Sequence, residues 1–350
     1  MKRWWEPEVG EKEVVAVRDV LESGYLNDGK VTRRFENKIK ELVRGNKFWE
    51  FGMCVPSGTM ALFAALKAVD VGPGDSVIIP DLSYIAAANA VKMCGAEVIL
   101  VDVKAGDLTL DPEKMVQALT PRTKAVIVVH VSGRRAEMGR ILEVAENAGL
   151  KGIKVIEDSC EAFPKKLEGD VACYSFSPNK IITTGQGGMV VTDDPKIYQN
   201  LTDLKYQGCR GERTGGDDVF EALGTNLKFT DIQAAIGLCQ VCKLKRRQRK
   251  LRKIYDWYRE ELGMGIYWFD ENDYPLWVVG KGIGEAEIRR IKKAGYECRK
   301  FWKPIHEQPM FPGNPEKFPE SSKGCRVWLP SHFSLTKRDV KKICKAIKGG

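Results

Sequence analysis

The sequence lacks a long hydrophobic run. None of its apolar stretches approaches the ~20 residues that a membrane-spanning helix requires. The first eight residues, Met-Lys-Arg-Trp-Trp-Glu-Pro-Glu, also lack the apolar segment of a secretory signal. We therefore expect a cytoplasmic protein without a membrane partner. Internal repeats and low-complexity segments are absent as well, so we expect ordinary globular domains.

The sequence also lacks clustered cysteines. Its ten cysteines are scattered between Cys54 and Cys344, which argues against a disulfide framework and predicts reduced, mostly buried thiols. One C-x-x-C pair, Cys239 and Cys242, lies in a helical pattern with no second pair and no spaced histidines nearby. Because a structural zinc ion needs four such ligands, no metal site is expected.

Nucleic-acid-binding motifs are missing too: there is no zinc finger, RNP motif or recognisable helix-turn-helix. The net charge of +9 nevertheless comes largely from one basic segment, 243–253. Leu244, Leu251 and Ile254 recur there at roughly helical spacing. The segment is therefore interpreted as part of a long helix with a solvated basic face, and binding to nucleic acid is the less favoured alternative.

What the sequence does contain is an alternation of strand-like and helical segments between residues 50 and 195. This alternation is typical of an α/β domain with a mostly parallel sheet. The predicted strands are 77–80, 97–102, 125–130, 154–157, 171–176 and 188–192. The predicted helices between them are 59–69, 85–93, 112–119 and 140–148.

The rest of the chain indicates two further parts. Helical periodicity extends from 231 to about 262, after which proline, glycine and aromatic residues return with a strand-like run at 275–279. With 350 residues, the chain is long enough for two domains. We expect an N-terminal helix and arm over 1–30, a large domain over 31–240 and a smaller α/β domain over 241–350.

Three features of the large domain point to one kind of chemistry. Pro-Ser-Gly-Thr at 56–59 begins a helix, where backbone N–H groups and the helix dipole favour an anion. Glu157 and Asp158 end a predicted strand, and an acid there can keep a pyridinium nitrogen protonated. Lys180 lies between a buried strand and a Gly-Gly turn, and partial burial makes such an amine nucleophilic.

Each feature has an ordinary structural explanation by itself. Ser-Gly-Thr is a good helix cap, a strand-end aspartate can cap a turn, and a loop lysine is usually just solvated. Their conjunction is more specific. A phosphate-binding loop, then a strand-end acid, then a lysine before Gly-Gly is what a site for pyridoxal 5'-phosphate (PLP) needs.

At these residues the sequence resembles the DegT/DnrJ/EryC1/StrS family, the PLP-dependent sugar aminotransferases of fold type I, whose large domain is aspartate-aminotransferase-like. The resemblance covers nearly the whole chain. The stretches that carry it are 29–36, 57–62, 72–80, 101–102, 157–158, 175–180 with the following Gly-Gly, 224–237 and 304–308.

The resemblance implies a role for several residues of the cofactor site. Lys180 would form the Schiff base with the cofactor and move protons, and Asp158 would contact the pyridine nitrogen. Tyr84 matches the aromatic residue that stacks on the ring. The residues that match the phosphate-binding positions are Gly58, Thr59 and Ser175.

Two further residues extend the predicted site. Asn226 matches a residue that reaches the phosphate of the neighbouring subunit, which implies a homodimer. Glu161 stands where many members have a glutamine near the cofactor's phenolic oxygen. Because two anions repel, we expect either that Glu161 is protonated or that it points elsewhere.

The resemblance implies the reaction as well. Family members usually transfer an amino group from L-glutamate to a nucleotide-linked keto-sugar, most often of the 4-keto-6-deoxyhexose type, in two half-reactions. A cyclitol or an aminohydroxybenzoate-type substrate is the alternative among enzymes, and a non-catalytic PLP-binding or regulatory protein is the alternative outside them. His306 is interpreted as structural and is left out of the catalytic set.

Overall fold

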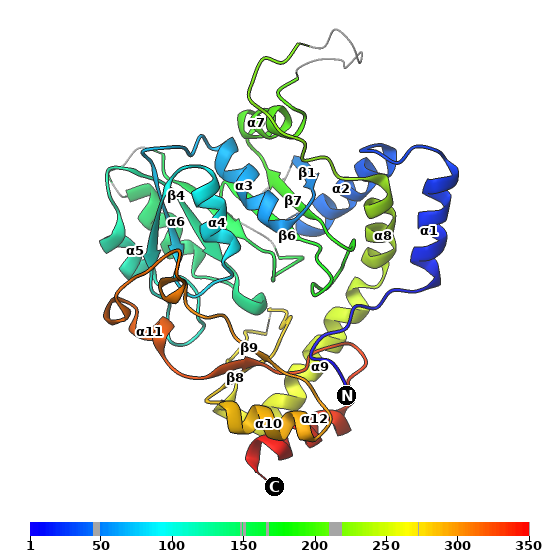
Figure 1. Cartoon of the computed structure of the whole chain (residues 1–350), viewed down its shortest axis with the longest axis vertical. Helices are drawn as coiled ribbons and strands as arrows, with labels where there is room; N and C mark the ends of the chain where they lie inside the picture. Colours follow the sequence, from blue (N-terminus) through cyan, green and yellow to red (C-terminus); the bar gives the residue numbers. More distant parts are fainter. Residues whose placement is uncertain are drawn as a thin grey trace.

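A seven-stranded sheet forms the centre of the chain in the computed structural model, which describes residues 1–44, 50–147, 149, 152–165, 168–209, 219–271 and 273–349 (Figure 1). The strand order is β1-β7-β6-β5-β4-β2-β3. The strands are β1 (Phe51–Val55), β2 (Ser76–Pro80), β3 (Glu97–Val101), β4 (Thr123–Val129), β5 (Lys154–Asp158), β6 (Val171–Ser175) and β7 (Gly188–Thr192).

The sheet is mostly parallel, as predicted. Only β7 runs antiparallel to its two neighbours, β1 and β6, whereas the pairs from β6 to β3 are parallel. The six strands predicted between residues 50 and 195 all form, with ends that differ by at most two residues. Strand β1 was not predicted. Its sequence, Phe-Gly-Met-Cys-Val, is short, and its glycine weakens the strand pattern, so its strand character depends on pairing with β7.

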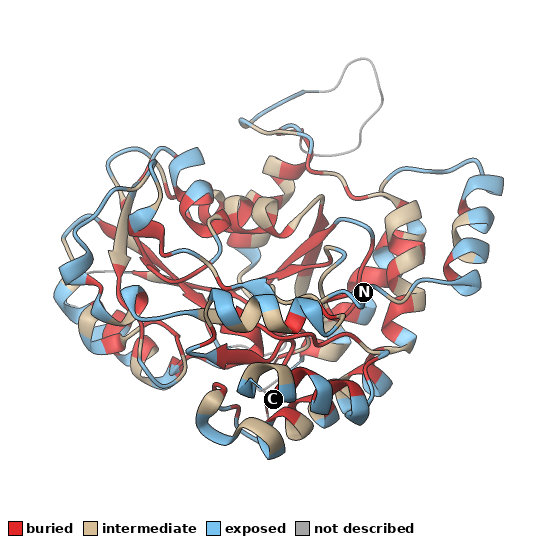
Figure 2. Cartoon of the chain, turned by 60° about the horizontal axis from the view of Figure 1, so that its bottom comes forward, coloured by how far each residue is buried: buried red, intermediate tan, exposed pale blue. Residues whose placement is uncertain are grey.

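Helices cover both faces of the sheet because alternate residues of the strands are apolar on both sides. Val77 and Ile79 of β2 belong to one hydrophobic cluster, and Ile78 between them belongs to another. Figure 2 shows this buried central layer under more exposed helices. The first cluster includes residues of α3 (Gly58–Ala68), α4 (Ala86–Met93) and α7 (Pro195–Lys205), and the second includes residues of α5 (Pro112–Ala118) and α6 (Met138–Asn147).

These helices agree with the predicted ones apart from their ends. Helix α6 begins two residues before the predicted 140, and Ala148, the last residue of that prediction, lies outside the described residues. The predicted helical segment 231–262 is two helices, α8 (Asp231–Cys242) and α9 (Leu244–Leu262), which meet at Lys243. Apolar periodicity alone did not reveal this junction, because both helices are amphipathic.

The C-terminal part has its own small sheet, in the order β8-β10-β9, with a separate hydrophobic cluster whose members all lie between Ile254 and Ile347. We therefore propose that a smaller domain begins near residue 241. The predicted strand at 275–279 is wrong in its bounds, because β8 begins only at Val279. The elements of the C-terminal part after α9 are β8 (Val279–Lys281), α10 (Glu285–Lys293), β9 (Arg299–Lys300), α11 (Pro319–Ser322), β10 (Arg326–Trp328) and α12 (Lys337–Lys348).

The basic segment of α9 is less solvated than predicted. Lys245, Arg249 and Lys253 are exposed, but Arg247 is only 1% exposed. The Arg247 guanidinium donates hydrogen bonds to the Ile181 carbonyl at 2.8 Å and to other buried oxygens. This arginine therefore joins α9 to the large domain. Among the described residues, no helix is both long and apolar enough to cross a bilayer.

The N-terminal segment crosses both parts of the protein. Lys2 lies against the C-terminal part, where its backbone pairs with that of Tyr296 and its ammonium pairs with Asp339 at 2.8 Å. The chain then continues into α1 (Glu11–Glu22), which packs beside α8 (Figure 1). Helix α2 (Lys30–Val43) follows.

Asp231 holds the start of α2 from the first turn of α8. Its carboxylate accepts the backbone N–H groups of Gly29, Val31 and Thr32 at 2.8 to 3.2 Å, and the Thr32 hydroxyl at 2.7 Å. It is 3% exposed. One buried carboxylate therefore satisfies helix N–H groups that would otherwise have no partner, and it lies near the positive ends of two helix dipoles.

Replacement of this carboxylate tests that account. We expect Asp231→Ala to lower the free energy of unfolding by about 2–4 kcal/mol, because several buried donors lose their partner. Asp111→Ala, which removes an exposed cap from α5, is the control and should cost about 1 kcal/mol. Urea unfolding followed by circular dichroism measures both. Equal losses in the two variants would contradict the role assigned to Asp231.

Candidate active site

A cavity of about 310 Å³ lies at the carboxyl ends of β4, β5 and β6, where ligands bind in open α/β sheets. Its wall comes from both parts of the chain. The lining residues are Ser57, Gly58, Thr59, Leu62, Tyr84, Ala86, Val129, Asp158, Cys160, Glu161, Ser175, Ser177, Pro178, Asn179, Lys180, Gln186, Trp277, Arg299, Trp302 and Trp328. Every predicted site residue except Asn226 is among them.

The first turn of α3 forms one wall of the cavity. The Ser57 hydroxyl caps the helix by accepting the Met60 N–H at 3.2 Å. Gly58 leaves no room for a side chain, because a Cβ atom there would lie 2.8 Å from the Ser175 Cβ and 2.9 Å from the Cys160 Sγ. The positive end of this helix therefore reaches the cavity and can bind an anion.

Asp158 and Glu157 point to opposite faces of the sheet, as successive strand residues do. The Glu157 carboxylate is fully buried and lies 2.8 Å from the His130 Nε2. The Ala136 N–H donates to the other nitrogen of that ring, so Nε2 carries the proton and donates it to Glu157. Asp158 lines the cavity and accepts the Cys160 N–H at 3.0 Å. The two neighbouring acids therefore have different surroundings: Asp158 faces the cavity, and Glu157 binds His130 on the other face of the sheet.

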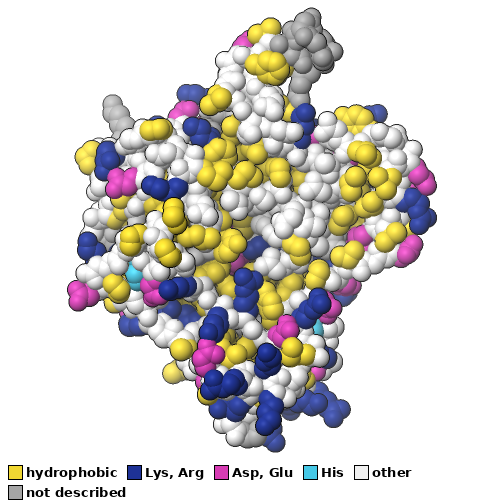
Figure 3. Space-filling model, in the orientation of Figure 1, with side chains coloured by type: hydrophobic (Ala, Val, Ile, Leu, Met, Phe, Trp, Pro, Cys, Tyr) yellow, Lys and Arg dark blue, Asp and Glu magenta, His cyan; other side chains and the backbone are white. Residues whose placement is uncertain are grey.

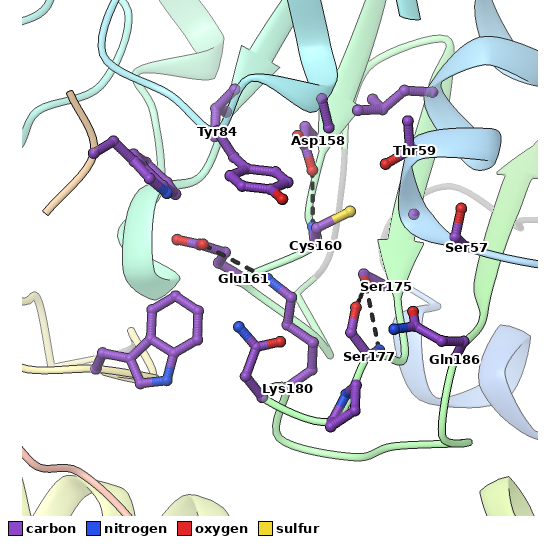
Figure 4. A pocket seen from close by; sticks show the side chains of 18 of the residues that line it. Ser57, Thr59, Tyr84, Asp158, Cys160, Glu161, Ser175, Ser177, Lys180 and Gln186 are labelled. Atoms are coloured by element: carbon purple, nitrogen blue, oxygen red, sulfur yellow. Dashed lines mark hydrogen bonds and ion pairs between the residues drawn. The ribbon is translucent and has the colours of Figure 1, made fainter. Parts of the chain in front are cut away.

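Lys180 and Glu161 point toward one another across the cavity, below Tyr84 (Figure 4). The Lys180 Nζ lies 3.6 Å from Glu161 Oε1 and 5.1 Å from the centre of the Trp277 ring. Glu161 Oε2 accepts the Ser132 N–H at 2.8 Å. Burial raises the pKa of Glu161, and the nearby Lys180 ammonium opposes that shift. Burial therefore makes this carboxyl group, which lies beside the Lys180 Nζ, easier to protonate than an exposed glutamate.

Hydroxyl groups gather near the first turn of α3. The Ser175 and Ser177 Oγ atoms are 2.6 Å apart and both line the cavity with Thr59 (Figure 4). Gln186 lies on the same side. Hydroxyl groups beside a helix N-terminus are suited to hydrogen-bond a phosphate group.

Tyr84 lies in the loop that follows β2, and His306 supports this loop through Asp81. The Tyr84 side chain is 54% exposed, which leaves its ring free to cover a ligand. His306 is 2% exposed, and its Nδ1 lies 2.7 Å from Asp81 Oδ2, while its backbone N–H donates to Asp81 Oδ1. This geometry agrees with the structural role expected of His306, which does not line the cavity.

Four residues of the C-terminal part complete the wall, and sequence reasoning missed all of them: Trp277, Arg299, Trp302 and Trp328. They are far from one another in the chain, so no local pattern joins them. Trp328 is anchored to the large domain because its Nε1 donates to the Ser132 Oγ at 3.0 Å. The abundance of tryptophan in this region was the one signal that could have drawn attention to them.

Asn226 lies outside the cavity of its own chain. It is exposed, and its backbone pairs with that of Tyr206 at the end of α7. Its side-chain oxygen accepts the Lys228 N–H at 3.2 Å. The remaining predicted residues are brought together around one cavity, whereas Asn226 does not line it.

A cavity with a lysine, a strand-end aspartate and a helix N-terminus, on a mostly parallel sheet of this order, defines an aminotransferase-like protein. The chain belongs to the DegT/DnrJ/EryC1/StrS aminotransferase family, which it matches over residues 7–348. It is therefore a transaminase of a PLP-dependent family. The predicted family, fold and enzyme class are confirmed, and a non-catalytic protein is not supported.

Three relatives illustrate the similarity. The chain is 34% identical to a GDP-perosamine synthase of Escherichia coli O157:H7 (98% of this chain, 96% of that one). It is also 34% identical to the spore coat polysaccharide biosynthesis protein SpsC of Bacillus subtilis strain 168 (98% and 95%). Its fold superimposes on the aminotransferase TlmJ from Streptoalloteichus hindustanus with a TM-score of 0.89 and 28% identity, over 100% and 98% of the two chains.

The raised pKa of Glu161 predicts how the thermal stability of the protein depends on pH. In the unfolded chain this carboxyl group titrates near its ordinary value of 4.5. Because the pKa of Glu161 is raised in the folded state, its carboxyl group stabilises the fold fully below the unfolded-state pKa. This stabilisation is lost as the pH rises through the folded-state pKa. Glu161→Gln cannot ionise. We therefore expect the Tm difference between the cofactor-free variant and the cofactor-free wild type to shift in favour of the variant, by about 2 °C or more, as the pH rises from about 4 to about 8.

Differential scanning fluorimetry across this pH range measures the effect. The control is Glu41→Gln, which changes an exposed glutamate of α2 and should track the wild type at every pH. If Glu161→Gln instead stays below the wild type by a growing margin as the pH rises, Glu161 is a stabilising anion and the assigned direction is wrong.

Proposed function

We propose that this protein uses PLP to transfer an amino group from L-glutamate to a nucleotide-linked keto-sugar, with a 4-keto-6-deoxyhexose as the expected type. The observation that carries the proposal is the placement of Lys180, Asp158 and the first turn of α3 around one cavity. These groups are the amine, the acid and the anion-binding site that PLP requires.

The cavity fits the cofactor in its chemistry. The first turn of α3, with Gly58 and Thr59, and the Ser175 hydroxyl would hold the phosphate group. Asp158 would accept a hydrogen bond from the pyridine nitrogen, and Tyr84 would cover the ring. Gly58 is decisive for this fit, because a side chain at that position would meet Ser175 and Cys160 and close the approach to the helix N-terminus.

When bound, PLP supplies an electron sink that stabilises a carbanion at the substrate's Cα. The chain's own residues do the rest. The Lys180 amine reaches into the cavity and can remove a proton at one carbon and return it at another. Asp158, whose carboxylate accepts the Cys160 N–H, would stabilise a positive charge on the ring nitrogen of the bound cofactor. Glu161 lies within 3.6 Å of the amine and can share a proton with it.

The substrate class is inferred from the relatives. Several are named GDP-perosamine synthases, at 30% to 34% identity to this chain. A further relative is named for spore coat polysaccharide biosynthesis. These names support a nucleotide-linked sugar as the acceptor and make GDP the first nucleotide to test. A cytoplasmic location is part of the same proposal.

We further propose that the active enzyme is a homodimer in which Asn226 reaches the neighbouring cavity. Asn226 is exposed and does not line the cavity of its own chain. Large hydrophobic side chains are exposed on and after α1: Val14, Val15, Leu21, Tyr25 and Leu26. Figure 3 shows hydrophobic side chains across the face that includes α1. Contact with a second copy would cover such a surface.

The assignment of Lys180 is tested by absorption spectroscopy. We expect wild-type protein loaded with PLP to show a visible band that L-glutamate removes, and Lys180→Ala to lack this band. Turnover should fall by about a hundredfold or more in the variant, because the proton-transferring amine is gone. Lys165→Ala is a control, because this buried lysine pairs with Asp273 away from the cavity. A glutamate-responsive band in Lys180→Ala would contradict the assignment.

The shared site is tested by subunit mixing. Asn226→Ala and Lys180→Ala should each be nearly inactive alone. A mixed dimer, however, contains one cavity with both native residues, so mixing equal amounts after mild dissociation should restore about a quarter of the wild-type activity. If each cavity is built from one chain only, mixing restores nothing.

A further inference from the structure

The cavity contains one charged residue to which the proposed chemistry gives no task. Its charged lining residues are Asp158, Glu161, Lys180 and Arg299. The first three act on the cofactor or beside it. Arg299 comes from β9, in the C-terminal part of the chain, and therefore lies in the wall contributed by that part.

The exposed Arg299 side chain lies over two tryptophan rings. Its Cζ atom lies 5.3 Å from the centre of the Trp4 ring and 5.7 Å from that of Trp328. Trp328 is 1% exposed and bonded to Ser132, so it is a rigid support. A guanidinium group over an aromatic face is attracted to it, while its N–H groups remain available at the edge.

Arg299 has no anionic partner in the described part of the chain. Neither an ion pair nor a side-chain hydrogen bond of Arg299 is found there, although its neighbours are occupied. Lys300 pairs with Glu285, and Arg326 on the adjacent strand donates to the Tyr267 hydroxyl and to two carbonyl groups. A cation that lies against aromatic rings, lines a cavity and has no internal partner is suited to a ligand's anion.

We propose that Arg299 anchors an oxyanion of the substrate at the cavity, and that it determines substrate affinity rather than cofactor binding. The inference rests on the proposed function, in which both substrates are anionic. L-Glutamate carries carboxylates, and a nucleotide-linked sugar carries a diphosphate. Both present pairs of oxygens that match the planar fork of a guanidinium group.

The experiment compares PLP-loaded wild type with Arg299→Gln and Arg299→Lys. The control is Arg259→Gln, because Arg259 also lies over a tryptophan ring, that of Trp268 at 5.2 Å, but does not line the cavity. One arm follows the rate at which L-glutamate removes the visible band at increasing glutamate concentrations. The other arm measures the affinity for GDP by titration calorimetry.

We expect Arg299→Gln to weaken one of these two affinities by about tenfold or more, because a charge-assisted hydrogen bond is lost. The visible band, the Tm and the maximal rate should stay near the wild-type values. Arg299→Lys should be intermediate, since it keeps the charge but loses the fork, and Arg259→Gln should be unchanged. A shift in the glutamate arm identifies a carboxylate as the anion, and a shift in the GDP arm identifies a diphosphate.

The proposal is overturned if neither affinity changes in Arg299→Gln, or if Arg259→Gln changes as much. Failure of the proposed function gives a different result. In that case wild-type protein itself shows no glutamate response, and the GDP arm alone then decides whether Arg299 anchors an oxyanion.

Discussion

The close approach of α3 to strands β6 and β7 is the contact on which the site depends. A Cβ atom at Gly58 would collide with Ser175 and Cys160, and one at Gly188 would lie 2.4 Å from the Ser57 carbonyl oxygen. Only glycine permits this packing, which brings the positive end of α3 to the ends of the strands. The hydroxyl groups, the acid and the lysine then surround one cavity.

A second constraint joins this site to the C-terminal part. All the polar groups of Ser132 have partners. Its N–H binds Glu161 within the large domain, while its carbonyl accepts the Leu276 N–H and its hydroxyl accepts the Trp328 Nε1–H, both from the C-terminal part. Its φ of 54° is uncommon for a residue with a side chain. The position of Glu161 and the tryptophan wall are therefore linked through one residue, so the two halves of the site are not independent.

Sequence reasoning predicted the larger part of this architecture. The buried strands are short apolar runs between turn residues, and such runs are recognisable without a structure. It failed where a neighbour decides the outcome. Strand β1 needed the pairing with β7, the junction of α8 and α9 at Lys243 left the periodicity intact, and Arg247 is buried because carbonyl and amide oxygens of other segments surround it.

The sequence by itself determined the chemistry of the site and its family, because a glycine, an acid and a lysine follow one another along the chain in an order that few other functions require. The tertiary structure alone decided that Glu161 turns toward Lys180 and which residues close the opposite wall. Arg299 and its tryptophan supports are distant in the chain. Their meeting is a property of packing between domains, which local patterns do not encode.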